Sequence, residues 1–186
     1  MNLERLLADL AAHTPADARE AESLSWLRSF VAAPEDPLAR GNPVGHVTAS
    51  AVIARPGGDS FLLIFHRKLG RWLQPGGHIE PGDTSLLDAA RREVAEETAI
   101  VEPVPLEPGI FDIDVHDIPA RKDEPAHEHF DVRVLLAARA LTFAASDEVA
   151  AARWVPLEEL ARVETDESVR RAIGKIRALS GATADR

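Results

Sequence analysis

Apolar residues near the start of the chain recur with the spacing of helices. Residues 3–12 predict a short amphipathic helix, because leucines recur there at helical intervals: Leu3, Leu6, Leu7 and Leu10. Thr14 then offers a capping hydroxyl, followed by a proline and an acid, which is typical of a helix start. This second helix is predicted to run to about Val31. Two prolines end it, and residues 34–43 have the composition of a linker.

After His46 the pattern changes to that of β-strands. Alternating or continuous apolar runs predict five strands, over residues 47–54, 61–65, 109–115, 129–140 and 152–157. A last helix is expected from Thr165, with three apolar residues on one face: Val169, Ile173 and Ile176. These elements predict an α+β domain with a mixed sheet between helices. We expect this domain to span residues 44–182, after an N-terminal helical extension over residues 1–40.

Composition and charge narrow the class of protein. The 186 residues suffice for one domain with a hydrophobic core. The chain has no cysteine, which excludes disulfides, thiolate metal sites and a cysteine nucleophile. A formal charge of −10 argues against a general affinity for nucleic acid. The N-terminal segment MNLERLLADLAAHT carries acids and no long apolar run, so no signal peptide is expected, and no stretch approaches the length of a membrane span. We therefore expect a soluble, cytoplasmic protein.

One segment, GGHIEPGDTSLLDAARREVAEETAI over residues 76–100, carries the candidate chemistry. Ser85 is a good helix N-cap, so a helix is predicted from near Leu86. At about 3.6 residues per turn, three glutamates fall within an arc of roughly 100° on one helix face: Glu93, Glu96 and Glu97. Three carboxylates on one face repel one another unless a cation lies between them. Hard oxygen ligands of this kind suit Mg²⁺ or Mn²⁺, which commonly bridges protein carboxylates to substrate phosphates.

Two neighbours support a metal site. Arg92 can pair with Glu96 one turn later, which would fix that carboxylate in its ionised form. The Gly76-Gly77 turn lets the backbone approach the site without side-chain obstruction. Glutamates at this spacing are, by themselves, more often a solvated helix face than a metal site. Here they belong to a longer pattern, GG-x-x-E-x-G-D followed by REVAEE, and the longer pattern favours the metal site.

The complete pattern resembles the Nudix box, a loop–helix–loop with a glycine, an acid and the run Arg-Glu-apolar-x-Glu-Glu-x-Gly-apolar. The resemblance implies a Nudix-like α/β/α sandwich. It also implies a pyrophosphohydrolase that cleaves a diphosphate linkage in a nucleoside diphosphate linked to another group, with Mg²⁺ or Mn²⁺. The implied metal ligands are the Gly77 carbonyl and three carboxylates: Glu93, Glu96 and Glu97. Arg92 would be the orienting arginine, Glu93 is our first choice as the catalytic base, and Glu97 would assist catalysis.

Three features depart from the family pattern. Eight residues separate Asp83 from Arg92 where the family has seven, and we place the extra residue in the turn before the helix. Asp83 also replaces the usual glutamate and is one methylene shorter. Ala99 stands where the family has a glycine that closes the helix in the left-handed conformation, a geometry that costs an alanine about 1 kcal/mol. None of the three departures removes a metal-binding carboxylate, so activity is expected.

Basic side chains around the box are candidates for substrate binding. Arg67 and Arg71 lie in a basic stretch ahead of the box, and His78 follows its glycines. We predict that all three contact phosphate, because cationic groups beside a phosphate site make electrostatic sense in an acidic protein. An ordinary exposed basic turn is the alternative. Trp72 either stacks on a base or anchors a loop on the core.

A histidine-rich stretch follows further along the chain. If residues 127–131 are extended, His127 and His129 share one face and Glu128 takes the other. We predict that the two histidines bind the substrate, and a loop-borne histidine or glutamate here could instead complete the metal shell. A solvated polar loop, with His116 and Glu124 in it, is an equally weighted alternative.

Three functional hypotheses follow. The leading one is a hydrolase acting on acid anhydrides in phosphorus-containing compounds, with a small-molecule nucleotide or diphosphate as substrate. The alternative is a catalytically silent, nucleotide-binding sensor or regulatory protein of the same fold. The third is a partner-binding module that uses the N-terminal helices, which could equally cover the substrate or form a homodimer. Loops outside the box set substrate choice in such enzymes, so the specific diphosphate stays open.

Overall fold

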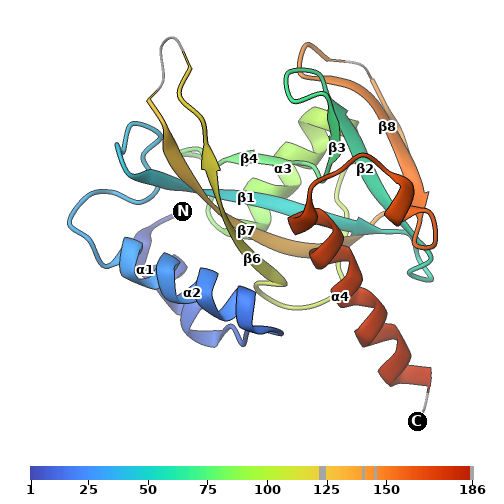
Figure 1. The fold of residues 1–186 in the computed structure, drawn as a ribbon, viewed down its shortest axis with the longest axis horizontal. Helices are drawn as coiled ribbons and strands as arrows, with labels where there is room; N and C mark the ends of the chain where they lie inside the picture. The colour runs from blue at the N-terminus through green and yellow to red at the C-terminus, as the bar shows by residue number, and fades with distance from the viewer. Residues whose placement is uncertain (122–124, 140, 145, 185–186) are drawn as a thin grey trace. The chain divides into compact units, whose positions relative to one another are not determined.

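The elements of the chain are drawn in Figure 1, a computed structural model that describes residues 1–121, 125–139, 141–144 and 146–184. In these residues there are four α-helices: α1 (Leu3–Ala12), α2 (Ala18–Val31), α3 (Leu86–Thr98) and α4 (Glu167–Ala184). Their eight strands are β1 (Gly45–Ala54), β2 (Ser60–His66), β3 (Arg71–Leu73), β4 (Gly76–His78), β5 (Val104–Pro105), β6 (Asp112–Ile118), β7 (His127–Ala137) and β8 (Val149–Pro156). A short 3-10 helix covers Leu160–Arg162.

Strand pairing is mixed. The strands are hydrogen-bonded in the order β3-β2-β1-β7-β5, while β4 pairs with β1, β6 with β7 and β8 with β2. β1 and β7 run in the same direction: the Glu128 N–H donates to the Val44 carbonyl at 2.9 Å. Further along the same strands, the Ala138 N–H donates to the Ala54 carbonyl at 3.1 Å. The other pairs are antiparallel, so the predicted α+β class with a mixed sheet is confirmed.

The chain divides into two compact units, and β1, α3 and β7 contribute residues to both. The first unit comprises Met1–Ser50, Gly76–Ala90 and Pro108–Val134. The second unit comprises Ala51–Pro75, Arg91–Glu107 and Leu135–Arg186. The N-terminal helices therefore belong to the same unit as β4, β6 and most of β7.

The N-terminal helices pack side by side and cover one face of that first unit (Figure 1). α1 begins at an asparagine cap, where Asn2 Oδ1 accepts from the Arg5 N–H at 2.9 Å. Leucines of both helices are buried: Leu6, Leu10, Leu24 and Leu27. Phe30 of α2 stacks on Phe130 of β7 with ring centroids 4.1 Å apart. The hairpin thus supplies part of the hydrophobic core around β7.

The start of α2 differs from the prediction. Thr14 was expected to cap this helix, but the cap is Asp17, whose Oδ1 accepts from the Glu20 N–H at 2.8 Å. Glu20 in turn accepts from the Ala16 N–H at 2.7 Å and contacts His13 Nε2 at 2.8 Å. An ionised aspartate at the N-cap is a stronger acceptor than a hydroxyl and suits the positive end of the helix, which explains the later start.

The second unit is built on β2 and β8. These strands pair over their full length, with Leu62 opposite Trp154 and Ile64 opposite Ala152. α4 starts after Asp166, whose Oδ1 accepts from the Val169 N–H at 3.1 Å, so the helix begins two residues later than predicted. Its predicted apolar face is confirmed as buried: Val169, Ile173 and Ile176. No helix in the described ranges combines the length and the apolar content needed to cross a membrane.

The helix of the box begins where the sequence predicted. Ser85 Oγ accepts from the Asp88 N–H at 3.1 Å, and α3 starts at Leu86. At the other end, the Ala99 N–H donates to the Ala95 carbonyl at 2.9 Å, and Ala99 has a φ of 57°. Ala99 therefore closes the helix in the left-handed conformation, where a Cβ is unfavourable.

Ala99→Gly should raise the free energy of unfolding by about 1 kcal/mol, because glycine adopts this conformation without the steric cost. The matched control is Ala95→Gly, one turn earlier in the same helix, which should lower it by about 1 kcal/mol. Urea unfolding of both variants checks the pair. Two changes of the same sign would contradict the left-handed helix end.

Candidate active site

Two of the three box glutamates on α3, Glu93 and Glu96, contact the same arginine. Arg92 Nη1 lies 2.9 Å from Glu93 Oε1 and 3.1 Å from Glu96 Oε2, so the predicted pair across one helical turn is present. Glu93 is largely buried, with 14% of its side chain exposed, whereas Glu96 has 57% exposed. The guanidinium neutralises part of the charge that two adjacent carboxylates create. All three box carboxylates lie on one helix, and an all-oxygen donor set of this kind fits a hard divalent cation.

The glycines of the box lie on β4, which pairs with β1. Gly77 is opposite Ala49, and Gly76 is opposite Ser50. A Cβ at Gly76 would lie 2.6 Å from the Ser50 Cα, so only glycine permits this close approach. Asp83 is buried, and its Oδ2 accepts from the Glu80 N–H at 2.8 Å. Asp83 thus closes the turn ahead of α3.

The basic residues ahead of the box lie in the second unit. Arg67 is exposed, and its Nε donates to the Ser146 carbonyl at 3.2 Å. Lys68 contacts Glu148 at 3.2 Å between two exposed side chains, which stabilises little. Arg71 is exposed on β3, a strand that the sequence did not predict. Trp72 of the same strand packs edge-on against Phe65, which favours the core-anchoring alternative over base stacking.

Polar residues alternate along β1, β6 and β7 and share one face. In the β6–β7 pair, opposite residues point to the same side, and the register places Asp112 opposite Arg133 and His116 opposite His129. β1 adds polar side chains at the same two-residue interval: His46, Thr48 and Ser50. Most members of this face are buried, so it is a polar layer inside the protein and not a solvated surface.

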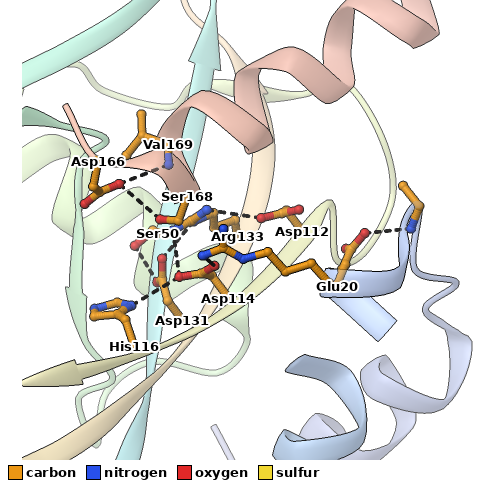
Figure 2. A network of polar contacts seen from close by, with 12 residues as sticks. Glu20, Ser50, Asp112, Asp114, His116, Asp131, Arg133, Asp166, Ser168 and Val169 are labelled. Atoms are coloured by element: carbon orange, nitrogen blue, oxygen red, sulfur yellow. Dashed lines mark hydrogen bonds and ion pairs between the residues drawn. The ribbon is translucent and has the colours of Figure 1, made fainter. Parts of the chain in front are cut away.

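Arg133 is the centre of this polar face (Figure 2), although only 1% of its surface is exposed. Its Nε donates to Asp131 Oδ2 at 2.8 Å, and its Nη1 donates to Asp112 Oδ2 at 3.1 Å. Nη2 lies 3.9 Å from Asp114 Oδ2. Asp131 Oδ1 accepts two further hydrogen bonds, from Ser50 at 2.7 Å and Thr48 at 3.1 Å. Three buried aspartates therefore surround one guanidinium.

The pKa shifts follow from these contacts. Burial alone would raise the pKa of Asp131, but Arg133, then His116 and the Ser50 hydrogen bond, hold it below its ordinary value. Burial would lower the pKa of Arg133, and the surrounding aspartates more than reverse this. Burial would likewise lower the pKa of His116, but its bond to Asp114 and the charge of Asp131 raise it. These contacts therefore favour the ionised forms of Asp131 and Arg133 in the folded protein.

Four further histidine rings gather on the same face. His46 lies with its ring centroid 4.8 Å from that of His78, 5.1 Å from that of His127 and 4.6 Å from that of His129. His46 is buried, and neither of its ring nitrogens has a hydrogen-bond partner among the described residues. Burial, then the charges of His78, His127 and Arg40, lower the pKa of His46 to about 4. Burial and the neighbouring histidines lower the pKa of His129 to about 3.

The histidine-rich stretch is a strand and not a solvated loop. His127 and His129 share a face of β7, as predicted for an extended segment, and His127 is 8% exposed. Glu128 points to the other face, beside Asp117 on β6, and burial followed by that like charge raises its pKa. Glu124, named above with this stretch, lies outside the described residues.

Sequence reasoning missed His46 and the charged residues around Arg133. The available signal was the two-residue alternation of polar side chains in three strands: H-x-T-x-S from His46, D-x-D-x-H from Asp112 and H-x-H-x-D-x-R from His127. That alternation is also typical of a solvated strand face. Only the register between the strands distinguishes a buried polar layer from a surface.

The fold and the box place this chain in a known family. The family model for the NUDIX domain matches residues 44–174, more than half of the chain. The chain therefore belongs to the NUDIX family, whose members are pyrophosphohydrolases of nucleotide-linked substrates, and it has the Nudix fold. No curated protein matches the chain.

Solved structures support the fold. The NUDIX domain of Shewanella oneidensis NrtR, complexed with ADP ribose, is 22% identical with a TM-score of 0.53, over 81% of this chain and 96% of that one. A C. elegans Ap4A hydrolase is 20% identical with a TM-score of 0.51, over 73% and 98%. The E. coli dihydroneopterin triphosphate pyrophosphohydrolase is 21% identical with a TM-score of 0.51, over 68% and 91%. At these identities the likeness concerns the fold alone.

Arg133→Met should lower the free energy of unfolding by about 3–5 kcal/mol, because it leaves buried aspartates without their cation. The matched control is Arg19→Met. Arg19 lies 3.6 Å from Asp114 but is 52% exposed, so the loss there should stay below about 1 kcal/mol. Urea unfolding at neutral pH compares the two. Equal losses of unfolding free energy in Arg133→Met and Arg19→Met would contradict the central position of Arg133.

Proposed function

We propose that this protein is a metal-dependent pyrophosphohydrolase that cleaves a diphosphate linkage in a nucleoside diphosphate linked to another group. The observation that carries the proposal is the carboxylate helix: Glu93 and Glu96 both contact Arg92 Nη1, and Glu97 follows on the same helix. Membership of the family supports it. A location in the cytoplasm stays part of the proposal and rests on the sequence alone.

The residues of the box have separate roles in this proposal. Glu93, Glu96 and Glu97 would hold Mg²⁺ or Mn²⁺, and the sequence also predicted the Gly77 carbonyl as a ligand. When bound, such an ion neutralises diphosphate charge and orients the attacking water. Glu93 accepts the proton of that water, and Arg92 keeps the Glu93 carboxylate in place through its 2.9 Å contact with Oε1. A fixed position of the Glu93 carboxylate allows it to take the proton as the water attacks phosphorus.

Phosphate recognition is proposed for basic side chains within and ahead of the box. Arg67 and Arg71 are exposed, and a guanidinium can bind two phosphate oxygens at once. His78 follows the box glycines on β4 and is half-buried. The sequence also predicted that His127 and His129 bind the substrate. The position of both rings beside His46 favours ligation of an ion over direct phosphate contact.

The test is turnover of a panel of organic diphosphates by the wild type, with Mg²⁺ and separately with Mn²⁺. The panel comprises a sugar nucleotide, ADP-ribose, a dinucleoside polyphosphate, a nucleoside triphosphate and a non-nucleotide diphosphate. We expect metal-dependent release of products, and a fall in kcat of about 10²- to 10⁴-fold in Glu97→Gln. The control is Glu107→Gln, a glutamate exposed outside the box, which should keep the wild-type kcat.

Two results would overturn the proposal. Equal turnover in wild type and Glu97→Gln would mean that the box carboxylates do not catalyse. Nucleotide binding without turnover of any compound would favour the alternative, a catalytically silent sensor of the same fold.

A further inference from the structure

Three histidines from neighbouring strands point to one spot. His46 lies on β1, and His127 and His129 lie two residues apart on β7. The strands are hydrogen-bonded here, since the Glu128 N–H donates to the Val44 carbonyl at 2.9 Å. A Cβ at Gly45 would lie 2.2 Å from the Glu128 carbonyl oxygen, so a glycine is needed for this close approach. The backbone itself brings the imidazoles together.

The three rings offer a compact set of ligand atoms. One nitrogen from each of His46, His127 and His129 lies within 4.8 Å of the other two. In a tetrahedral site with metal–nitrogen bonds of about 2.1 Å, the nitrogens are about 3.4 Å apart. Small side-chain rotations are therefore enough to close the set around an ion. Among the residues that the structure describes, no other group of three histidines or acids has its ligand atoms this close together.

The tautomer of His127 suits a ligand. Its Nδ1 lies 2.9 Å from the Pro125 carbonyl, an atom that can only accept a hydrogen bond. Nδ1 therefore carries the proton, and the lone pair of the neutral ring is on Nε2. Metal-binding histidines commonly donate their second ring N–H to a carbonyl in this way, which fixes the ring orientation.

The burial of His46 gives an independent indication. The side chain is 1% exposed, and neither ring nitrogen has a hydrogen-bond partner in the described part of the chain. Buried polar groups are normally satisfied, and a cation would accept the lone pair that the protein leaves without a donor. The low pKa values of His46 and His129 keep both rings neutral at pH 7, which is the form that binds metal.

We propose that His46, His127 and His129 bind one divalent transition-metal ion of the Zn²⁺ class. Neutral imidazoles suit Zn²⁺, Co²⁺ or Ni²⁺, whereas Mg²⁺ prefers carboxylate and carbonyl oxygens. Three protein ligands leave a fourth position for a water or a substrate oxygen, as in sites where zinc takes part in chemistry. The site differs from the carboxylate helix in donor chemistry, and its existence does not depend on the proposed hydrolase activity.

Cobalt binding tests the proposal. Metal-stripped protein is titrated with Co²⁺, and visible absorption reports a four-coordinate site with three nitrogen ligands. We expect one Co²⁺ per chain, displaced by Zn²⁺ and not by Mg²⁺. His46→Gln and His129→Gln should weaken Co²⁺ binding by more than about 100-fold. Loss of a residue that only hydrogen-bonds to a metal ligand already lowers metal affinity by about 10- to 100-fold, and these two variants remove a ligand itself.

Two controls separate this site from its surroundings. His116→Gln removes a ring on the same face outside the trio, and the triple variant Glu93→Gln, Glu96→Gln, Glu97→Gln removes the box carboxylates. Both should keep the cobalt spectrum. If His46→Gln does not fold, the proposal is tested by the loss of Co²⁺ binding in His129→Gln and by a rise in the Tm of the wild type when Zn²⁺ is added. An absent spectrum, a spectrum unchanged in the histidine variants, or one lost only in the glutamate variant would overturn the proposal.

Discussion

The buried charge of Arg133 is the constraint on which the polar face of the sheet depends. Asp114 of β6 lies directly opposite Asp131 of β7, and Asp112 lies opposite Arg133. The three carboxylates would repel one another inside the protein without a cation. The Arg133 guanidinium donates hydrogen bonds of 2.8 Å to Asp131 and 3.1 Å to Asp112. The second carboxylate oxygen of Asp131 accepts hydrogen bonds from Ser50 and Thr48. A buried ion pair of this kind contributes little net stability, but removing one partner is costly. The register of β6 against β7 is therefore fixed by charge as well as by apolar packing.

That register in turn places the histidines. His116 lies opposite His129 in the same ladder, two residues from Asp114, and β1 adds His46 through the close approach at Gly45. From Phe130 onward the opposite face of β7 is apolar, and Phe130 packs there on Phe30 of the N-terminal hairpin. One strand thus separates a hydrophobic layer from a polar layer with metal-binding side chains. The hairpin belongs to the core of its unit, so it is more than an attached segment.

The sequence predicted the local features well and the long-range ones poorly. The limits of α1 and the start of α3 at Leu86 followed from patterns within a few residues, and Ala99 retains the left-handed conformation of the family's glycine. Short strands such as β3 and β5 were missed, because two or three residues carry no periodicity. Arg133 and His46 were missed for another reason: a polar residue in a strand indicates solvent unless its partners across the sheet are known. The sequence indicated His127 and His129, but their position beside His46 becomes clear only from the pairing of β7 with β1.

Both metal assignments can be tested in one experiment, anomalous diffraction from crystals soaked with Mn²⁺ and, separately, with Zn²⁺. Mn²⁺ should appear beside Glu93, Glu96 and Glu97 of α3, since these oxygens suit a hard cation. Zn²⁺ should appear between His46, His127 and His129. Mn²⁺ peaks confined to surface acids outside α3 would contradict the central claim that this helix is the catalytic metal site.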